Sequence, residues 1–271
     1  MHKFSSNTFH ALSLLTPYDI NKTKFRAGNE RDGAYIILEE PASTDVLSFG
    51  ISTDTSFEEA MAVKGHRLFL YDHTIPSCPT ENPSFNFHRV GICGDNNPGP
   101  DLLTLEQHIA NIANPSERLF LKIDVEGAEW DVFSTISRDT LARFDQIVIE
   151  LHWFSHLNDP LFAGKLIKSL EKINEQFTLY HVHGNNCAPI TKVNGFVVAD
   201  VIEVSYVRTS LVTRSASKTV YPSPLNKGNT PHFYDHALLF YPFLPSSAEL
   251  EQIRDMVDRV GADYQPTPRP A

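Results

Sequence analysis

Residues 121–130 read LKIDVEGAEW, an apolar strand that runs through an acidic turn into a helix. The apolar run Leu119–Ile123 ends at Asp124, and a helical pattern begins at about Gly127. This unit is typical of a parallel sheet with helices on its faces. Ligands of such sheets bind at the carboxyl ends of the strands, so Asp124 is predicted to face a binding cleft. The alternative is that Asp124 and Glu126 only cap the helix and complement its dipole.

The same alternation of an apolar run with a helical pattern recurs on both sides of this stretch. It predicts α/β architecture, with a seven-stranded, mostly parallel sheet, an antiparallel last strand and helices on both faces. The strands are expected at 45–49, 67–71, 86–92, 119–123, 146–151, 177–182 and 200–208. The helices are expected at 56–64, 103–112, from about 127, from 160 to about 177, and from the capping box at Ser246 to about Gly261.

The bulk composition predicts one domain, residues 1–271, with a core of about 26–208 and an extension over 209–271. Of the 271 residues, 41% are hydrophobic, enough for a sizeable buried core. The formal net charge is −10, which argues against a phosphate-tracking surface, so no nucleic-acid partner is expected.

Cysteine usage and the first residues predict a cytoplasmic protein. Cys78, Cys93 and Cys187 are odd in number and form no CxxC pair, which favours a reducing compartment over a disulfide framework. The apolar stretch at 11–15 is too short for a signal peptide or a membrane span, so no membrane partner is expected.

Two polar loops after the first two strands suggest a nucleotide-type ligand. Gly50 follows the first strand and lets the backbone approach a ligand closely, although Ser52 replaces the second glycine of a GxGxxG loop. Asp72 follows about twenty residues later, where an acid can accept both ribose hydroxyls of an adenosine. Gly91 would lie near the adenine. The alternatives are an ordinary strand–helix turn at Gly50 and a helix N-cap or a solvated turn at Asp72.

Histidines end the fifth and sixth strands. His152 and His183 could converge with Asp124 on one cleft, whereas His181 shares a strand face with His183. One histidine could then act as general base toward a hydroxyl. Alternatively, Asp124, His152 and His183 could hold a divalent metal that lowers the pKa of the hydroxyl. A purely structural role for each histidine is the remaining interpretation.

Several of these motifs resemble the FkbM-type methyltransferase family. The segment 122–130 (KIDVEGAEW) resembles its hallmark, and 28–35 (GNERDGAY) resembles its DGGY element with Ala34 in place of the second glycine. Further likenesses, which extend the match over about 26–208, are 48–58 (SFGISTDTSFE), 148–153 (VIELHW), 181–186 (HVHGNN) and 200–208.

The resemblance implies a Rossmann-like class I methyltransferase fold with S-adenosylmethionine as the methyl donor. It implies O-methylation of a hydroxyl on a small molecule, a sugar or a secondary metabolite. Gly50 would line the methionine part of the cofactor, Asp72 the ribose, and Asp124 would lie beside the sulfonium. The same resemblance assigns Gly33, Tyr35 and Glu58 to the cofactor site.

Three rival functions follow from the same sheet. A nicotinamide-dependent oxidoreductase needs a GxGxxG at the first turn, which is absent. A non-catalytic binding or scaffold protein would have no use for Asp72, Asp124 and the histidines. A metal-dependent hydrolase would leave the spacing between Gly50 and Asp72 without a purpose.

Overall fold

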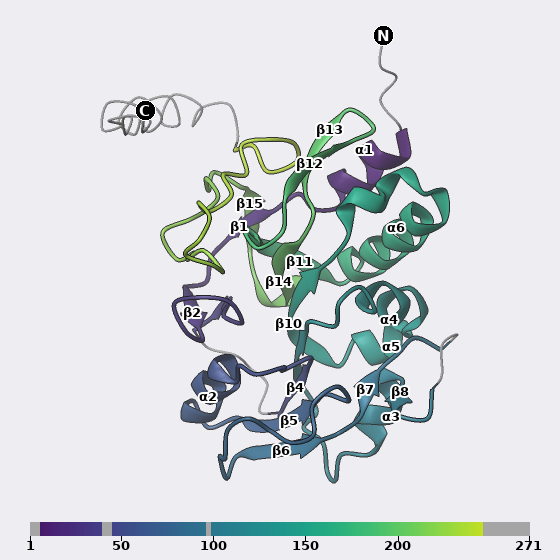
Figure 1. Ribbon diagram of the computed structural model, residues 1–271, viewed down its shortest axis with the longest axis vertical. Helices are drawn as coiled ribbons and strands as arrows, with labels where there is room; N and C mark the ends of the chain where they lie inside the picture. Colours follow the sequence, from purple (N-terminus) through teal and green to yellow (C-terminus); the bar gives the residue numbers. More distant parts are fainter. Residues whose placement is uncertain (1–5, 40–44, 96–98, 246–271) are drawn as a thin grey trace, which may run out of the picture.

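The computed structural model describes residues 6–39, 45–95 and 99–245. Its centre is a seven-stranded sheet in the order β11-β14-β10-β9-β4-β5-β6 (Figure 1). β14 is antiparallel to β10 and β11, and the other pairs are parallel. The predicted mostly parallel sheet with an antiparallel last strand is therefore confirmed. The strands are β4 (Asp45–Phe49), β5 (Arg67–Tyr71), β6 (Phe85–His88), β9 (Leu119–Ile123), β10 (Phe144–Leu151), β11 (Phe177–Gly184) and β14 (Ile202–Arg208).

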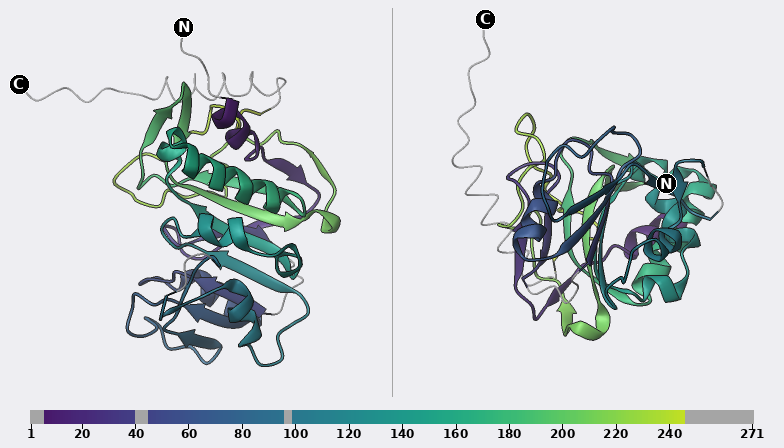
Figure 2. Two further views of the ribbon diagram at one scale, coloured as in Figure 1. Left: turned by 90° about the vertical axis from the view of Figure 1, so that its right-hand side faces the viewer. Right: turned by 90° about the horizontal axis from the view of Figure 1, so that it is seen from below.

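Successive residues of the inner strands point to opposite faces, and each face has its own hydrophobic core. In β4, Leu47 joins the larger core and Val46 the smaller one. The larger core receives α1 (Ser6–Ser13), α3 (Leu105–Ala110), α4 (Glu129–Thr135), α5 (Arg138–Leu141) and α6 (Pro160–Asn174). The smaller core receives α2 (Ser56–Val63) and the hairpin of β2 (Lys24–Ala27) and β3 (Tyr35–Leu38). Helices thus cover both faces, as predicted (Figure 2).

One predicted strand is wrong in its extent. The run 86–92 was expected to be a single strand, but β6 ends at His88, where the Val90 N–H donates back to the His88 carbonyl at 2.8 Å. This tight turn leads into β7 (Gly91–Ile92), which pairs with β8 (Leu102–Leu103) in a separate two-stranded sheet. Alternating apolar residues on both sides of the turn concealed it in the sequence.

Besides the β2–β3 hairpin, the sequence analysis missed two other two-stranded pairings. The 184–199 connection forms β12 (Ile190–Val193) and β13 (Phe196–Ala199), joined by Asn194 and Gly195, which both have positive φ. Asn-Gly between two short runs is a strong hairpin signal, so this one was available in the sequence. β1 (Tyr18–Ile20) pairs with β15 (Arg214–Ala216) across most of the chain length, a pairing that no local pattern shows.

The segment 217–245 has no regular element and packs over the carboxyl end of β11 and the amino end of β14. Tyr221, Leu238 and Phe243 are buried in the larger core. The helix predicted from Ser246 to about Gly261 lies outside the described residues. Among the described helices, none is long and apolar enough to span a bilayer.

Candidate active site

A cleft of about 290 Å³ opens at the carboxyl ends of β4, β5 and β9. Four of the predicted cofactor residues line it: Gly50, Asp72, Gly91 and Asp124. A second cleft, at the opposite ends of the strands beside Gln146, holds none of the predicted site residues. The structure therefore gathers the glycine loop, the acid of the second strand and the acid of LKIDVEGAEW around one cavity.

Gly50 is fixed in place by a close approach to the backbone of Asp124. A Cβ built on Gly50 would lie 1.6 Å from the Asp124 carbonyl oxygen, and its φ is +74°. The buried Lys122 ammonium donates to the Gly50 carbonyl at 2.7 Å and lies 3.9 Å from Asp124 Oδ2. Only glycine fits this position, so the loop and the end of β9 form one rigid floor for the cleft.

Asp72 forms a turn, since no helix follows it, and it also lines the cleft. Its Oδ1 accepts from the Thr74 N–H at 2.8 Å and the Thr74 hydroxyl at 2.6 Å, and its Oδ2 accepts from the Ser52 N–H at 2.9 Å. Burial alone would raise the pKa of Asp72, but the bonds from Thr74 and Ser52 outweigh it and hold the pKa below its ordinary value. Asp72 is thus an ionised acceptor that shapes its own turn and still lines the cleft.

Gly33, Tyr35 and Glu58 do not line this cleft. Gly33 has a positive φ and packs against Asp54. Tyr35 is buried in the smaller core, edge-on to Phe57. Glu58 is buried beneath the cleft and accepts from the Ser48 hydroxyl. Burial raises the pKa of Glu58 against the opposing influence of the Lys122 charge.

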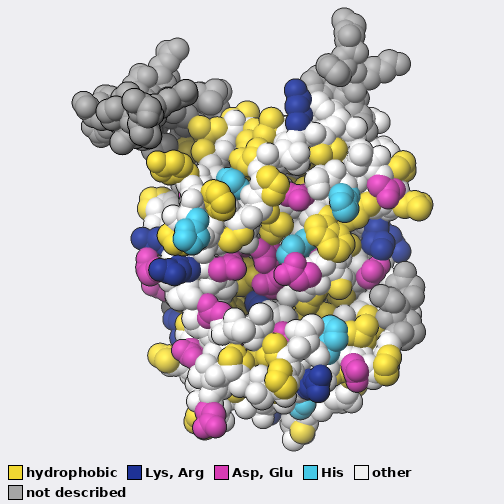
Figure 3. Space-filling view, in the orientation of Figure 1, with side chains coloured by type: hydrophobic (Ala, Val, Ile, Leu, Met, Phe, Trp, Pro, Cys, Tyr) yellow, Lys and Arg dark blue, Asp and Glu magenta, His cyan; other side chains and the backbone are white. Residues whose placement is uncertain are grey.

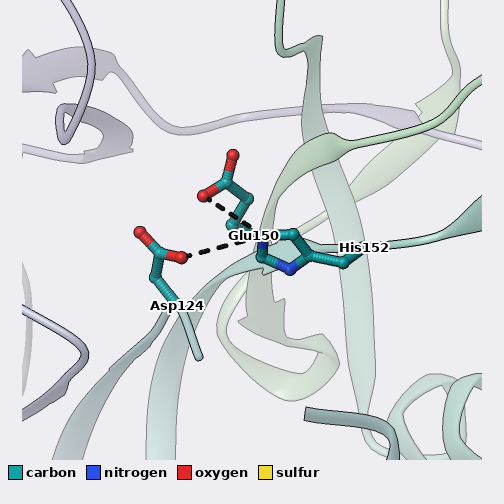
Figure 4. Close-up of side chains that lie close together, drawn as sticks. All are labelled: Asp124, Glu150 and His152. Atoms are coloured by element: carbon teal, nitrogen blue, oxygen red, sulfur yellow. Dashed lines mark ion pairs between the residues drawn. The ribbon is translucent and has the colours of Figure 1, made fainter. Parts of the chain in front are cut away.

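Asp124, Glu150 and His152 form an acid–imidazole group beside the cleft (Figure 4). His152 Nε2 lies 3.7 Å from Glu150 Oε2 and 4.0 Å from Asp124 Oδ1. A third carboxylate, from the exposed Glu126, comes to 3.5 Å from the same nitrogen. In Figure 3, acidic side chains gather with histidines across the middle of this face.

Glu129 orients the histidine of this group. One buried Glu129 oxygen lies 2.8 Å from the His152 backbone nitrogen and 3.1 Å from His152 Nδ1, and the other accepts from the Gly127 N–H at 2.8 Å. The Trp130 indole donates to the His152 carbonyl at 2.9 Å. His152 is therefore held on three sides, with Nδ1 as the donor and Nε2 aimed at Asp124 and Glu150.

The charges in this group shift two pKa values upward. Burial lowers the pKa of His152, but the hydrogen bond and charge of Glu129, with the charges of Asp124 and Glu126, raise it above its ordinary value. Burial, reinforced by the charges of Asp124 and Glu203, raises the pKa of Glu150 well above its ordinary value. Such perturbed pairs are typical of functional sites.

The structure does not bring His183 into this group. Its Nδ1 lies 2.9 Å from Glu203 and its Nε2 lies 2.8 Å from Asp235, so both ring nitrogens are engaged elsewhere. Glu150, not His183, is the third member of the group with Asp124 and His152. Glu150 and His152 are two residues apart at a strand end and therefore share a face, a signal that was present in the sequence.

A second acidic group adjoins the first through Glu150. Oxygens of Asp32, Glu150 and Glu203 lie within 4.8 Å of one another. The Asn229 amide donates to both Asp32 and Glu203, and the Asn185 amide donates to Glu150 at 2.5 Å. Beyond Asp124, and outside the lining of the cleft, these residues form an acidic wall that is built from β10, β14, the 28–33 loop and the 217–245 segment.

Comparison with known proteins supplies a sequence match to one family. Residues 24–176, more than half of the chain, match the family described as the methyltransferase FkbM domain. No curated protein matches the chain.

Solved structures resemble the chain only distantly. Precorrin-6y C5,15-methyltransferase from Geobacter metallireducens GS-15 is 10% identical with a TM-score of 0.32, over 63% of this chain and 84% of that one. N-methyltransferase NodS from Bradyrhizobium japonicum WM9 is 10% identical with a TM-score of 0.35, over 62% and 86%. The plantazolicin methyltransferase BpumL, in complex with a monoazolic desmethylPZN analog and SAH, is 10% identical with a TM-score of 0.28, over 61% of this chain and 76% of that one.

Proposed function

This chain belongs to the FkbM methyltransferase domain family and is an S-adenosylmethionine-dependent methyltransferase, and we propose that it methylates a hydroxyl oxygen of a small-molecule or sugar acceptor. The observation that carries the proposal is the shared position of Asp124. This residue lines the cleft and also belongs to the group with Glu150 and His152. A methyl donor in the cleft and a hydroxyl acceptor bound at this group would therefore both lie beside the Asp124 carboxylate.

The cleft supplies what the donor requires. The adenosine ribose carries two hydroxyl donors, and the ionised Asp72 has acceptor capacity beyond its three internal bonds. Gly50 and Gly91 both line the cleft, and a Cβ on either would collide with a neighbour, the Asp124 carbonyl oxygen at Gly50 and the His73 ring at Gly91. The sulfonium carries a positive charge, which a position beside Asp124 would stabilise.

Methyl transfer itself requires positioning and the loss of one proton. The acceptor oxygen forms a bond to the methyl carbon while the bond between that carbon and sulfur breaks. The electron pair of the broken bond stays on sulfur, which gives S-adenosylhomocysteine. Holding donor and acceptor in line supplies much of the rate acceleration. The hydroxyl proton must leave during the same step. The group of Asp124, Glu150 and His152 can promote this, either with His152 Nε2 as the general base or through a bound metal ion.

Calorimetric titration with S-adenosylhomocysteine tests the donor half of the proposal. We expect micromolar binding to the wild-type protein. Asp72→Asn should weaken binding by about 10-fold to 100-fold, because a charge-assisted hydrogen bond to ribose contributes about 1.5–3 kcal/mol. His152→Ala should bind almost as tightly as wild type, because His152 does not line the cleft. Absence of binding to the wild-type protein would contradict the proposal.

Transfer from S-adenosylmethionine labelled with ¹³C in its methyl group tests the acceptor half. The enzyme is incubated with panels of sugars, hydroxylated small molecules and amines, and the methyl resonance of the product is recorded. We expect an O-methyl resonance, and slow turnover by His152→Ala at unchanged donor affinity. A product methyl bound to nitrogen or carbon would disprove O-methylation while leaving the donor site intact.

A further inference from the structure

We infer that Asp124, Glu150 and His152 form a binding site for one divalent cation of the Mn²⁺ class. The inference deepens the proposed function, since such a cation would lower the pKa of an acceptor hydroxyl that coordinates it. It replaces the ligand set expected from the sequence, because Glu150 takes the place of His183.

The ligand atoms are already close to coordination distance. One atom from each of the three side chains lies within 4.8 Å of the others, and His152 Nε2 is 3.7 Å from Glu150 and 4.0 Å from Asp124. Two ligands on opposite sides of a cation with bonds of about 2.2 Å are about 4.4 Å apart. The group therefore needs only small side-chain movements to surround one ion.

His152 Nε2 provides an independent sign of a missing ligand. The side chain is 5% exposed, yet Nε2 forms no hydrogen bond with any described residue. Its nearest neighbours are carboxylate oxygens at 3.5 Å and beyond. A ring nitrogen without a hydrogen bond is uncommon in a side chain this buried, and here it is aimed into the group.

Glu129 prepares this nitrogen for a cation. It accepts a hydrogen bond from Nδ1–H, which leaves the lone pair of the neutral ring on Nε2. Metal-binding histidines nearly always donate their second ring N–H to a carboxylate or carbonyl in this way. The same contact fixes the ring plane, since Glu129 also binds the backbone of His152.

The charge balance of the group favours a cation as well. Four carboxylates surround one imidazole: Asp124, Glu126, Glu129 and Glu150. The nearest cationic side chain is Lys122, which lies 3.9 Å from Asp124 Oδ2 but is committed to the Gly50 carbonyl. A set of two carboxylates and one imidazole has the donor hardness that suits Mn²⁺.

Mn²⁺ itself is the probe for this site. Metal-stripped full-length protein is titrated with MnCl₂, and the free ion is followed by electron paramagnetic resonance without any cofactor present. We expect one Mn²⁺ per chain, and both Glu150→Gln and His152→Ala should weaken binding at least about tenfold. Glu117→Gln is the matched control, because this exposed carboxylate precedes β9, at the opposite end of the strand from Asp124, and the Mn²⁺ affinity of the variant should stay within about twofold of wild type.

The variants also separate this site from its neighbours. Retention of Mn²⁺ by His152→Ala together with its loss in Glu203→Gln would move the ion to the second acidic group and overturn the assignment. Loss in His183→Gln alone would restore the ligand set expected from the sequence and also overturn it. No Mn²⁺ binding by wild type would leave His152 as a general base and end the inference.

S-adenosylhomocysteine binding, measured in the same preparations, distinguishes the two possible failures. A variant that loses Mn²⁺ but still binds the cofactor product is folded, so its loss reports on the ligand set. A wild-type protein that binds the cofactor product but no Mn²⁺ would disprove the metal site and leave the methyltransferase proposal standing.

Discussion

Gly50 meets two separate requirements, because it lines the cleft and also packs against the backbone of Asp124. It was expected to give a ligand access to the backbone, and it does line the cleft. Its strictest constraint, however, is internal, because the space of a Cβ is occupied by the Asp124 carbonyl oxygen at 1.6 Å. A neighbour this close lies in the backbone of β9 and cannot move aside cheaply.

Gly50→Ala is expected to be severely destabilising. The new methyl must displace the end of β9, and alanine is also strained at φ +74°. We expect a loss of about 2–4 kcal/mol in the free energy of unfolding, measured by urea denaturation. Gly65→Ala shares a positive φ but meets no atom within 4 Å, so it should cost only the conformational strain of about 1 kcal/mol. Equal losses in the two variants would show that the contact with Asp124 does not matter.

Single residues also mark where sequence reasoning succeeds and where it stops. Asp72, Asp124 and His152 stand at strand ends, and strand ends are readable from apolar runs. The partners of His183 are not readable, because Glu203 and Asp235 reach it from β14 and from a segment without pattern. Glu129 was read only as part of a helix start, although it orients His152.

At the level of elements, burial decided which strands could be predicted. β4, β5 and β9 match their expected ranges residue for residue, because inner parallel strands are apolar on both faces and end sharply at polar residues. β6 is an edge strand with alternating exposure, and its end was misplaced. β1, β2 and β3 were missed because each is only three or four residues long.

The contact between β11 and the 217–245 segment should make stability depend on pH. Burial lowers the pKa of His183, but the charges and hydrogen bonds of Glu203 and Asp235 outweigh it and raise the pKa to about 9 from 6.5. His181, the other titratable group beside it, has a pKa held well below its ordinary value by burial. His183 therefore holds its proton more tightly in the folded chain, and this stabilisation is complete below pH 6.5 and is lost as the pH rises through about 9.

We expect His183→Gln to flatten this dependence. Between pH 6.5 and about 9, the unfolding free energy of wild type should fall more than that of the variant, by about 3 kcal/mol at most. Urea denaturation at a series of pH values measures the difference. His232→Gln, an exposed histidine of the same segment, is the control and should follow wild type. Parallel curves for wild type and His183→Gln would mean that Glu203 and Asp235 do not raise the pKa of His183 in the folded chain.

At the scale of the whole molecule, the 209–271 extension was predicted to be irregular over 209–245 and then helical from Ser246 to about Gly261. Apart from a 3-10 helix at Thr209–Leu211 and β15, its described part is irregular, but it completes the core and the acidic wall. Leu238 is fully buried, and the Asn226 amide is 3.0 Å from the ring of His181. The sequence could not show this, because packing of an irregular segment depends on single contacts rather than on a repeated pattern.

A single cooperative unit should therefore include this segment. Leu238→Ala is expected to lower the free energy of unfolding of the whole chain by about 2–5 kcal/mol, as for any core leucine. Tyr234→Ala, at a position that is 96% exposed, should change it by less than about 0.5 kcal/mol. Thermal unfolding followed by circular dichroism and by tryptophan fluorescence should shift together in Leu238→Ala. A shift in neither signal would show that the segment is not part of the cooperative domain.

The bond between Asn229 and Asp32 joins residues 197 positions apart in the sequence. The lining of the donor cleft, by contrast, lies between Phe49 and Ala128. During synthesis from the amino terminus, the residues of the cleft leave the ribosome long before Asn229 does. The acidic wall is thus completed after the cleft, and nascent chains would acquire their cofactor pocket before they could enclose a substrate.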